Sequence, residues 1–393
     1  MKITFLGDIM IDNETAKHLS QYYINGRYQF DDMFTNIKEL LSRSDYVLAN
    51  LETPISFDNS DLTDVQWQFC SPREFAESIK NAGIHFVSTA NNHCLDRGIK
   101  GLTNTIDVLD EINLKHTGTF KTNHSRPLSI ININGVKIGC LAYTYGTNAV
   151  TNNNYLGRKY RKCVNLIQEQ EGYIQLLDPI QRINRKYSIA FLSKLFNKID
   201  MFLFPENKEK EWFEKRSFDL YRRVLLRKDI RKIKGKSDIQ ILMLHIGGQY
   251  NSSPNEYTLK TVKRLQKKFN IIIANHEHVV HPHCMDMSNR HFAAYSLGNL
   301  ISGSGTICKP FDKFSEYSIA VHFYIEEESK QINKITFSVL KVINDNNRLM
   351  VYPAFDLIKS NNNLKLVNDT LNIASRFGNR KYDLLEEEYE LLE

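Results

Sequence analysis

Ser88-Thr89-Ala90-Asn91-Asn92-His93 is the stretch that decides the fold, because an apolar run precedes it and a helical pattern follows it. Residues 84–87 predict a buried strand, and residues 101–112 predict a helix. Asn92 and His93 are therefore expected on a loop at the carboxyl end of a strand, where open α/β sheets place their ligand crevices. Asparagine offers a neutral oxygen ligand, and histidine can bind a metal ion or transfer a proton near neutral pH. Taken alone, the hexapeptide fits a capped turn with a solvated histidine equally well.

The same arrangement recurs at four other predicted strand ends, and each of these ends carries a metal-ligating residue type. Single Asp or Asn residues after a strand are common in ordinary turns. Together, however, the five ends supply two carboxylates, an amide oxygen and three imidazoles. Such a set suits zinc, iron, manganese or nickel better than calcium, and a carboxylate shared by two ions would make a dinuclear centre. The candidate ligands are Asp8, Glu52, Asn92, His245, His276 and His278.

Strands and helices alternate along most of the chain, which is typical of a layered α/β fold. Helices are expected over 31–43, over 72–82 with Ser71 as N-cap and Pro72 at the first position, and over 257–269. Further strands are expected over 3–8, 46–49, 136–143, 239–244 and 271–274. Segments 317–325 and 332–343 alternate apolar and polar residues, which predicts antiparallel strands of a second sheet.

Composition is that of a globular protein with a substantial core, since 42% of the 393 residues are hydrophobic. The net charge of +6 is mild and does not by itself indicate nucleic acid, which we do not expect as a partner. The six cysteines include no C-x-x-C pair, which favours reduced thiols. Neither a secretory signal nor a membrane-spanning run is recognisable, so we expect a cytoplasmic protein.

Residues 151–237 interrupt the alternation and predict a basic, mostly helical insertion. Its part 158–236 holds 21 Lys/Arg and 10 Asp/Glu. A helix over 189–204 has an apolar face that would pack on the parent domain or lie on an anionic membrane. Residues 208–236 predict a solvated helix, or else a site for an anionic polymer. Residues 351–393 are expected to form a helical and acidic tail.

Six short motifs resemble the CapA family, the bacterial capsule and poly-γ-glutamate biosynthesis proteins, which form a branch of the calcineurin-like metallophosphoesterases. The resemblance implies a four-layer α/β/β/α sandwich over 1–150 and 238–350, with a dinuclear metal site. It implies that the six candidate ligands named above hold one or two divalent ions (Mn, Zn or Fe), with Glu52 as the bridging carboxylate. His93 would be a general acid or electrostatic clamp, and we group Asn91 and Asp96 with it as catalytic. The motifs are Gly7-Asp8, Asn50-Leu51-Glu52, Ala90 to His93, His245 to Tyr250, His276 to Val280 and Tyr295 to Asn299.

Departures from the family pattern affect both the site and its surroundings. Met10 stands where superfamily members usually have a ligand histidine, and Gln249 stands where CapA proteins usually have glutamate. The family pattern Gly-His-His-Pro-His is replaced here by Ala274-Asn275-His276-Glu277-His278. We expect Glu277 either to support a ligand histidine or to be exposed. No membrane anchor of the kind common in poly-γ-glutamate export is expected here. These differences favour a soluble hydrolase or transferase over membrane-bound polymer synthesis.

Three functions remain open from the sequence. The first is a metal-dependent hydrolase acting on a phosphoester or amide in capsule, exopolysaccharide or poly-γ-glutamate metabolism, with an anionic small molecule or polymer as substrate. The second is a non-catalytic assembly or polymer-binding subunit that contacts capsule-machinery proteins. The third gives the main role to the insertion, which would dock on an anionic polymer, on nucleic acid or peripherally on the inner membrane through 158–236.

Overall fold

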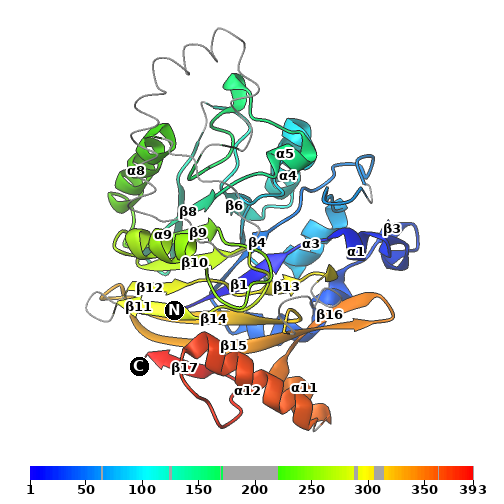
Figure 1. The fold of residues 1–393 in the computed structure, drawn as a ribbon, viewed down its shortest axis with the longest axis vertical. Coiled ribbons are helices and arrows are strands. Elements are labelled where there is room, and N and C mark those ends of the chain that lie inside the picture. Colours follow the sequence, from blue (N-terminus) through cyan, green and yellow to red (C-terminus); the bar gives the residue numbers. More distant parts are fainter. Residues whose placement is uncertain are drawn as a thin grey trace.

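The fold consists of two β-sheets packed face to face, with helices on both outer sides (Figure 1). It comes from a computed structural model that describes residues 1–62, 65–123, 126–168, 170, 220–286, 291–304, 314–361 and 363–392.

The first sheet contains nine strands of the described chain, in the order β16-β15-β14-β1-β4-β5-β6, with β13 beside β1 and β17 beside β15. Strands β1, β4, β5 and β6 are parallel, whereas β14, β15 and β16 are antiparallel. The bounds are β1 (Lys2–Ile9), β4 (Tyr46–Leu51), β5 (Phe86–Ser88), β6 (Lys115–Thr117), β13 (Asn299–Ile301), β14 (Tyr317–Glu326), β15 (Gln331–Asp345), β16 (Arg348–Pro353) and β17 (Tyr389–Leu392).

The second sheet has the order β11-β12-β10-β9-β8-β7, and its central strands β8, β9, β10 and β12 are parallel. Its bounds are β7 (Ser129–Ile133), β8 (Val136–Thr144), β9 (Ile239–His245), β10 (Ile271–Asn275), β11 (His283–Asp286) and β12 (His291–Ala294). A separate hairpin pairs β2 (Tyr23–Ile24) with β3 (Arg27–Tyr28).

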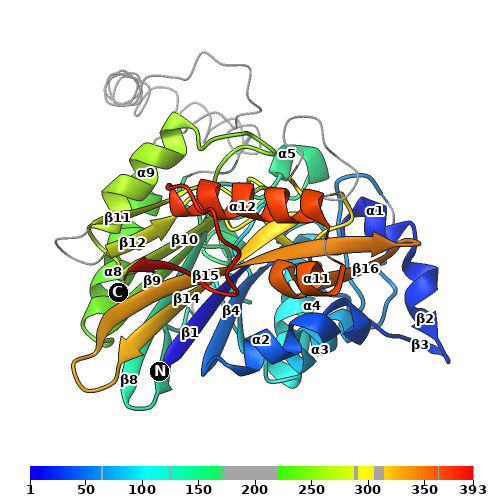
Figure 2. The ribbon, with the colours of Figure 1, turned by 90° about the horizontal axis from the view of Figure 1, so that it is seen from below.

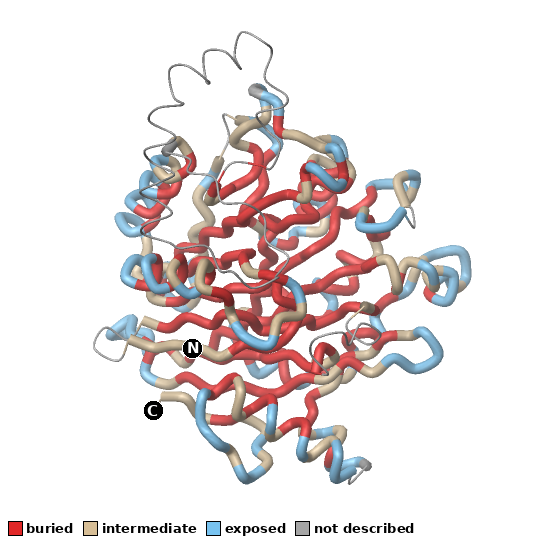
Figure 3. Tube along the Cα trace, in the orientation of Figure 1, coloured by how far each residue is buried: buried red, intermediate tan, exposed pale blue. Residues whose placement is uncertain are grey.

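Alternation along the strands builds three apolar layers, because successive side chains point to opposite faces of a sheet. Phe5 of β1 belongs to the core between the sheets, whereas its neighbour Leu6 belongs to the outer layer. The outer layer of the first sheet includes residues of α3 (Arg73–Asn81) and α4 (Gly98–Glu111). That of the second sheet includes residues of α8 (Leu220–Lys234) and α9 (Glu256–Gln266). The predicted α/β/β/α sandwich is confirmed, and buried backbone runs through both sheets (Figure 3).

The remaining helices are short or lie near the C-terminus. The predicted helix over 31–43 is divided into two 3₁₀ turns and one short α-helix. Helix α3 begins one residue later than predicted, since Pro72 is its N-cap and Ser71 hydrogen-bonds Thr53 instead. The bounds are α1 (Asn13–Ala16), η1 (Leu19–Tyr22), η2 (Asp31–Met33), η3 (Thr35–Ile37), α2 (Lys38–Ser42), α5 (Ala149–Asn152), η4 (Arg158–Tyr160), α11 (Ala354–Asn361) and α12 (Leu364–Gly378).

Strands β14 and β15 are antiparallel to each other as predicted, but their expected placement in a second sheet is wrong. They extend the first sheet, because β14 pairs with β1 and places Phe323 opposite Ile3. The alternating pattern reports one buried face of a strand and carries no information about the strand beside it.

The described ends of the predicted insertion pack on the fold. Leu156, Val164 and Leu166 lie in a cluster with residues of α4. On α8, Leu226, Ile230 and Ile233 are buried against the second sheet. The prediction of a solvated helix is therefore wrong for α8. The apolar stripe of α8 is narrow, and the many charged residues around it make the stripe difficult to recognise from the sequence. The helix predicted over 189–204 lies outside the described residues.

The C-terminal region forms part of the first sheet and of its covering layer. Helix α12 packs on β15, and the acidic tail ends in β17, which pairs with β15 (Figure 2). The tail was predicted to be helical, but it also contains a strand. Tyr389 and Leu391 alternate along this strand and pack on the apolar core. In the described ranges, none of the helices has both the length and the apolar character needed to cross a bilayer.

Candidate metal centre

The predicted ligands meet at one edge of the sandwich, where the carboxyl ends of parallel strands from both sheets converge. Asp8 lies near the end of β1 and Glu52 directly follows β4. His245 ends β9, and His276 directly follows β10. Asn92 lies on the loop between β5 and α4. The two sheets thereby place residues far apart in sequence within one buried volume.

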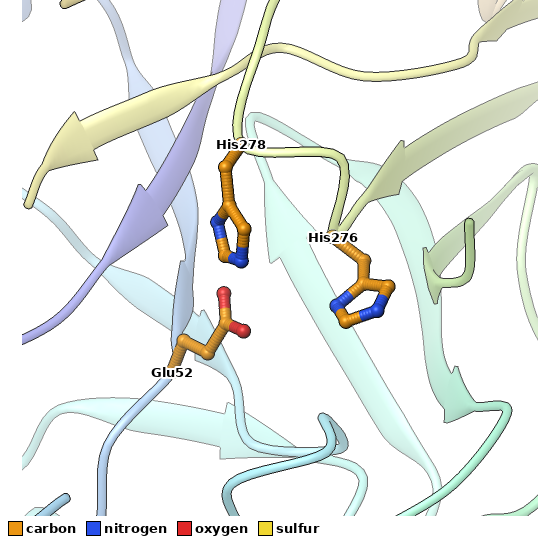
Figure 4. A group of neighbouring side chains, drawn as sticks. All are labelled: Glu52, His276 and His278. Atoms are coloured by element: carbon orange, nitrogen blue, oxygen red, sulfur yellow. The ribbon is translucent and has the colours of Figure 1, made fainter. Parts of the chain in front are cut away.

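Glu52 is common to two groups of side chains that could hold a metal ion. One group is Asp8, Glu52 and His245, and the other is Glu52, His276 and His278; the ligand atoms within each group lie within 4.8 Å of one another. Figure 4 shows the Glu52 carboxylate pointing toward the imidazole of His278, with His276 beside them. This arrangement suits a carboxylate that bridges two cations.

The Glu52 carboxylate is fully buried and has no hydrogen-bond donor within the described residues. His245 Nε2 lies 3.2 Å from its Oε1. Burial raises the pKa of Glu52, although His278 and His93 oppose this shift. A buried ionised carboxylate is costly unless positive charge compensates it. A divalent cation would supply that charge, so the residues present fit a metal ion.

Asp8 faces the same volume and is also fully buried. Its Oδ1 accepts a hydrogen bond of 2.7 Å from Asn50 Nδ2, and its Oδ2 accepts one of 3.3 Å from the His276 backbone. Burial and the neighbouring Glu52 carboxylate raise the pKa of Asp8 well above its usual range. Two adjacent buried carboxylates repel each other, and a shared cation would relieve this repulsion.

The imidazoles offer neutral nitrogen ligands. Burial, together with the neighbouring imidazoles, lowers the pKa of His245 and of His276 well below the usual range. Both rings are therefore neutral at neutral pH and keep a lone pair for a metal ion. Nε2 of His245 lies 2.7 Å from Oδ1 of Asn92, which brings the predicted amide ligand to the same place.

His93 lies beside this volume and forms a buried pair with Asp96. Nδ1 of His93 and Oδ2 of Asp96 are 2.6 Å apart. The ring stacks on Phe69, with centroids 3.8 Å apart and an interplanar angle of 8°. Burial alone would lower the pKa of His93, but the charge and hydrogen bond of Asp96, with Glu52 adding to them, raise it above its usual value. The site thus holds an imidazole that stays protonated more readily than a free one.

Asn91 and Asp96 hold the loop in place through their side chains. Nδ2 of Asn91 donates to the Leu51 carbonyl at 2.7 Å, and its Oδ1 accepts from the His93 backbone at 3.2 Å. Asp96 also accepts from the Phe69 backbone at 2.7 Å. These contacts support positioning roles for both residues around His93.

Comparison with known proteins gives the family. The family model described as bacterial capsule synthesis protein PGA_cap matches residues 2–304. The chain belongs to this family. The resemblance to CapA that the motifs predicted is thereby confirmed.

Two relatives of the PGA_cap protein come from Bacillus. The capsule biosynthesis protein CapA of Bacillus anthracis is 23% identical over 313 residues, which cover 78% of this chain and 60% of the relative. The PGA biosynthesis protein CapA of Bacillus subtilis (strain 168) is 21% identical over 309 residues, which cover 78% of this chain and 64% of the relative. The chain therefore spans less than two thirds of the length of either relative.

Solved structures show only a distant likeness. A novel phosphatase from Mycoplasma pneumoniae has a TM-score of 0.44 and 12% identity, with 86% of this chain and 92% of that chain covered. A hypothetical protein from Thermus thermophilus has a TM-score of 0.38 and 11% identity, with 90% and 98% covered.

Four residues of the PGA_cap site were not predicted as part of it. Asn50 donates to Asp8 and lies 3.4 Å from Nδ1 of His245. Tyr145 and Asn299 contact His276 and His278, and Phe69 stacks on His93. Asn50 and Asn299 lie within the family motifs, so their place at strand ends was a usable signal. Tyr145 also follows a strand, but nothing in its local sequence distinguishes it from a core aromatic.

The departures from the family pattern have different structural settings. Met10 is buried next to the β1 end. Gln249 is exposed. Glu277 is fully buried, so the alternative of an exposed side chain is wrong. It accepts hydrogen bonds from the Gly248 backbone at 2.8 Å and from Asn251 at 3.2 Å, which anchor the loop after His245.

Proposed function

We propose that this PGA_cap protein is a metal-dependent hydrolase that cleaves a phosphoester, or an amide, in capsule, exopolysaccharide or poly-γ-glutamate metabolism. The observation that carries the proposal is the buried Glu52 carboxylate, which lacks a hydrogen-bond donor in the described chain and belongs to two ligand groups. A protein bears such a cost where function requires it.

One ion would be held by Asp8, Glu52 and His245, with Asn92 beside them, and a second by Glu52, His276 and His278. When bound, these cations would supply positive charge for phosphoryl oxygens and lower the pKa of a water molecule.

His93 would act as general acid. Asp96 holds its Nδ1 and raises its pKa, and the stacked ring of Phe69 fixes its orientation. The protonated imidazole would then transfer a proton to the leaving group.

The test is a metal count by mass spectrometry on the purified full chain, combined with turnover of bis(p-nitrophenyl) phosphate in Mn²⁺, Zn²⁺ or Fe²⁺. We expect bound metal and metal-dependent turnover, both lost in Glu52→Gln. The matched control is His116→Ala. Nε2 of His116 lies 3.1 Å from Oδ1 of Asp110, and neither residue belongs to the site, so this variant should change neither readout. Metal without turnover would favour a non-catalytic capsule-assembly subunit. Absence of metal would contradict the proposal.

A second candidate function, binding of an anionic polymer, is supported by the outer face of α8 and α9. These helices cover adjacent strands of the second sheet. On this face, Asp229 is buried and Glu256 pairs with Lys260. We define the basic surface as the exposed cations Arg227, Lys228, Arg231, Lys232, Lys234, Lys263, Arg264, Lys267 and Lys268.

Polyglutamate binding tests this candidate, because counterion release makes such binding steeply dependent on salt. Arg227→Glu combined with Arg231→Glu should weaken binding about tenfold or more and flatten the salt dependence. Lys365→Glu combined with Lys381→Glu is the control, since both side chains are exposed and lie outside the basic surface. Equal losses in the two double variants would contradict a specific role for this surface.

A further inference from the structure

We propose that Tyr145 is a positioning residue that makes His276 present Nδ1, rather than Nε2, to the metal centre. Asn299 would act in the opposite sense on His278, which would present Nε2. The inference rests on the proposed metal-dependent function. It concerns which nitrogen of each ring serves as ligand, and which residues decide this.

The hydroxyl of Tyr145 occupies one nitrogen of His276. Tyr145 directly follows β8 and is buried, and its Oη lies 2.9 Å from Nε2 of His276. The two ring centroids are 4.7 Å apart. Nε2 is therefore held on the side of the ring away from Glu52, as Figure 4 shows.

The other nitrogen of His276 has no such partner. Nδ1 is buried and lacks a hydrogen bond to any described residue. In Figure 4 it faces Glu52 and His278. An unpaired buried nitrogen is costly, and a ligand role explains why this one is retained. If Nδ1 keeps its lone pair for a cation, Nε2 carries the ring proton and donates it to the Tyr145 oxygen.

Backbone conformation also fixes the direction of this ring. His276 has φ = +113°, which is unusual for a residue with a side chain. Its N–H donates to Oδ2 of Asp8 at 3.3 Å. A metal ligand, Asp8, thus holds the strained backbone of His276, and Tyr145 holds the far end of its ring.

His278 is oriented in the opposite way. Its Nδ1 lies 2.9 Å from Oδ1 of Asn299 and 3.8 Å from Oδ2 of Asp8. Both oxygens are acceptors, so the ring proton belongs on Nδ1. Nε2 then keeps its lone pair, and in Figure 4 it points toward the Glu52 carboxylate. Partners of this kind typically contribute about 10–100-fold to metal affinity.

The first experiment measures Zn²⁺ affinity of the full chain by competition with a chelator. Tyr145→Phe keeps the ring and removes the hydroxyl, and we expect it to weaken Zn²⁺ binding about 10–100-fold. Tyr143→Phe is the matched control, because Tyr143 lies two residues earlier, on β8, and donates to Asp229 in the outer layer. Its Zn²⁺ affinity should not change.

The second experiment uses the wild-type protein, so its result does not depend on the folding of a variant. Nitrogen NMR of ¹⁵N-histidine protein loaded with Zn²⁺ should show His276 bound through Nδ1 and protonated at Nε2, with His278 the reverse. Coordination of His276 through Nε2, or equal Zn²⁺ affinity of the two tyrosine variants, would overturn this inference but leave the proposed metal centre intact. A wild-type chain that binds no Zn²⁺, Mn²⁺ or Fe²⁺ would overturn the metal centre and this inference with it.

Discussion

Glu52 has opposite effects on stability and on function. In the metal-free protein its buried carboxylate lacks a donor from the described chain, and a buried unpaired polar group costs about 1–3 kcal/mol. Glu52→Gln keeps the shape of the side chain and removes its buried negative charge. We therefore predict that it raises the free energy of unfolding of the metal-free protein by about 1–3 kcal/mol at pH 8. Chemical denaturation in the presence of a chelator measures it.

The pH dependence of this effect has a defined sign. Since burial raises the pKa of Glu52 in the folded state, its cost is complete above the folded pKa and vanishes below the unfolded value. The advantage of Glu52→Gln should therefore shrink as the pH falls toward 4.5, the ordinary value for this group. A variant that is less stable at pH 8 without metal would contradict the assignment.

His93 provides the second prediction, which separates catalysis from metal binding. His93→Ala should lower turnover of bis(p-nitrophenyl) phosphate by about 10²–10⁴-fold while the metal content stays unchanged, because the loss is that of a general acid. Mass spectrometry and the turnover assay, run on the same sample, test both statements. Simultaneous loss of metal would make His93 a ligand instead.

Asp96 gives a related prediction for the pH profile. It raises the pKa of His93, so Asp96→Asn should lower that pKa. An acid with a lower pKa loses its proton at lower pH, and the alkaline limb of the activity profile should move in that direction. An unshifted limb would indicate that another group supplies the proton.

Helix α8 is held on the second sheet by one charged contact as well as by its apolar stripe. Asp229 accepts hydrogen bonds of 2.7 Å from Arg126 and from Tyr143. We predict that Asp229→Ala lowers the free energy of unfolding by about 3 kcal/mol, since it leaves a largely buried guanidinium without its counter-charge. Denaturant unfolding measures the loss. Asp383→Ala, which removes an exposed partner of Lys381, should have no measurable effect.

The two ends of the chain are joined in the first sheet by the Glu388 carboxylate. It accepts from Lys2 on β1, from Tyr324 on β14 and from Thr336 on β15. Burial alone would raise the pKa of Glu388, but His322, Lys2 and Thr336 outweigh this and lower it to about 2. One carboxylate thus links three strands to the segment that leads into β17.

Acid should therefore weaken the whole molecule partly through this residue. A carboxyl group with a lowered folded pKa stabilises above its unfolded pKa, and this contribution disappears as the pH falls from about 4.5 to about 2. Glu388→Gln should cost about 2 kcal/mol at pH 7 and much less at pH 2, as measured by denaturant unfolding. Glu390→Gln, in which a half-buried pair with Lys334 is lost, is the control. Equal effects at both pH values would contradict the linkage.

The sequence alone was sufficient for the layered fold and for the main members of the site. Apolar runs identified the central strands, and polar residues at or shortly after the ends of these strands marked Asp8, Glu52, Asn92 and His245. This worked because burial has a local period and because parallel strands bring their carboxyl ends to one edge. The period of burial and the end of a strand can both be recognised from the few residues around a given position in the sequence.

Only the tertiary structure decided which elements pack against each other and which way the side chains of the site point. It placed β14 beside β1, showed the buried stripe of α8 and revealed that Asn91 binds the Leu51 carbonyl. It also brought Tyr145 to Nε2 of His276, 131 residues away in sequence. Local periodicity specifies which face of an element is buried, but the neighbour that covers this face, and the nitrogen that an imidazole turns toward a site, depend on contacts between distant segments.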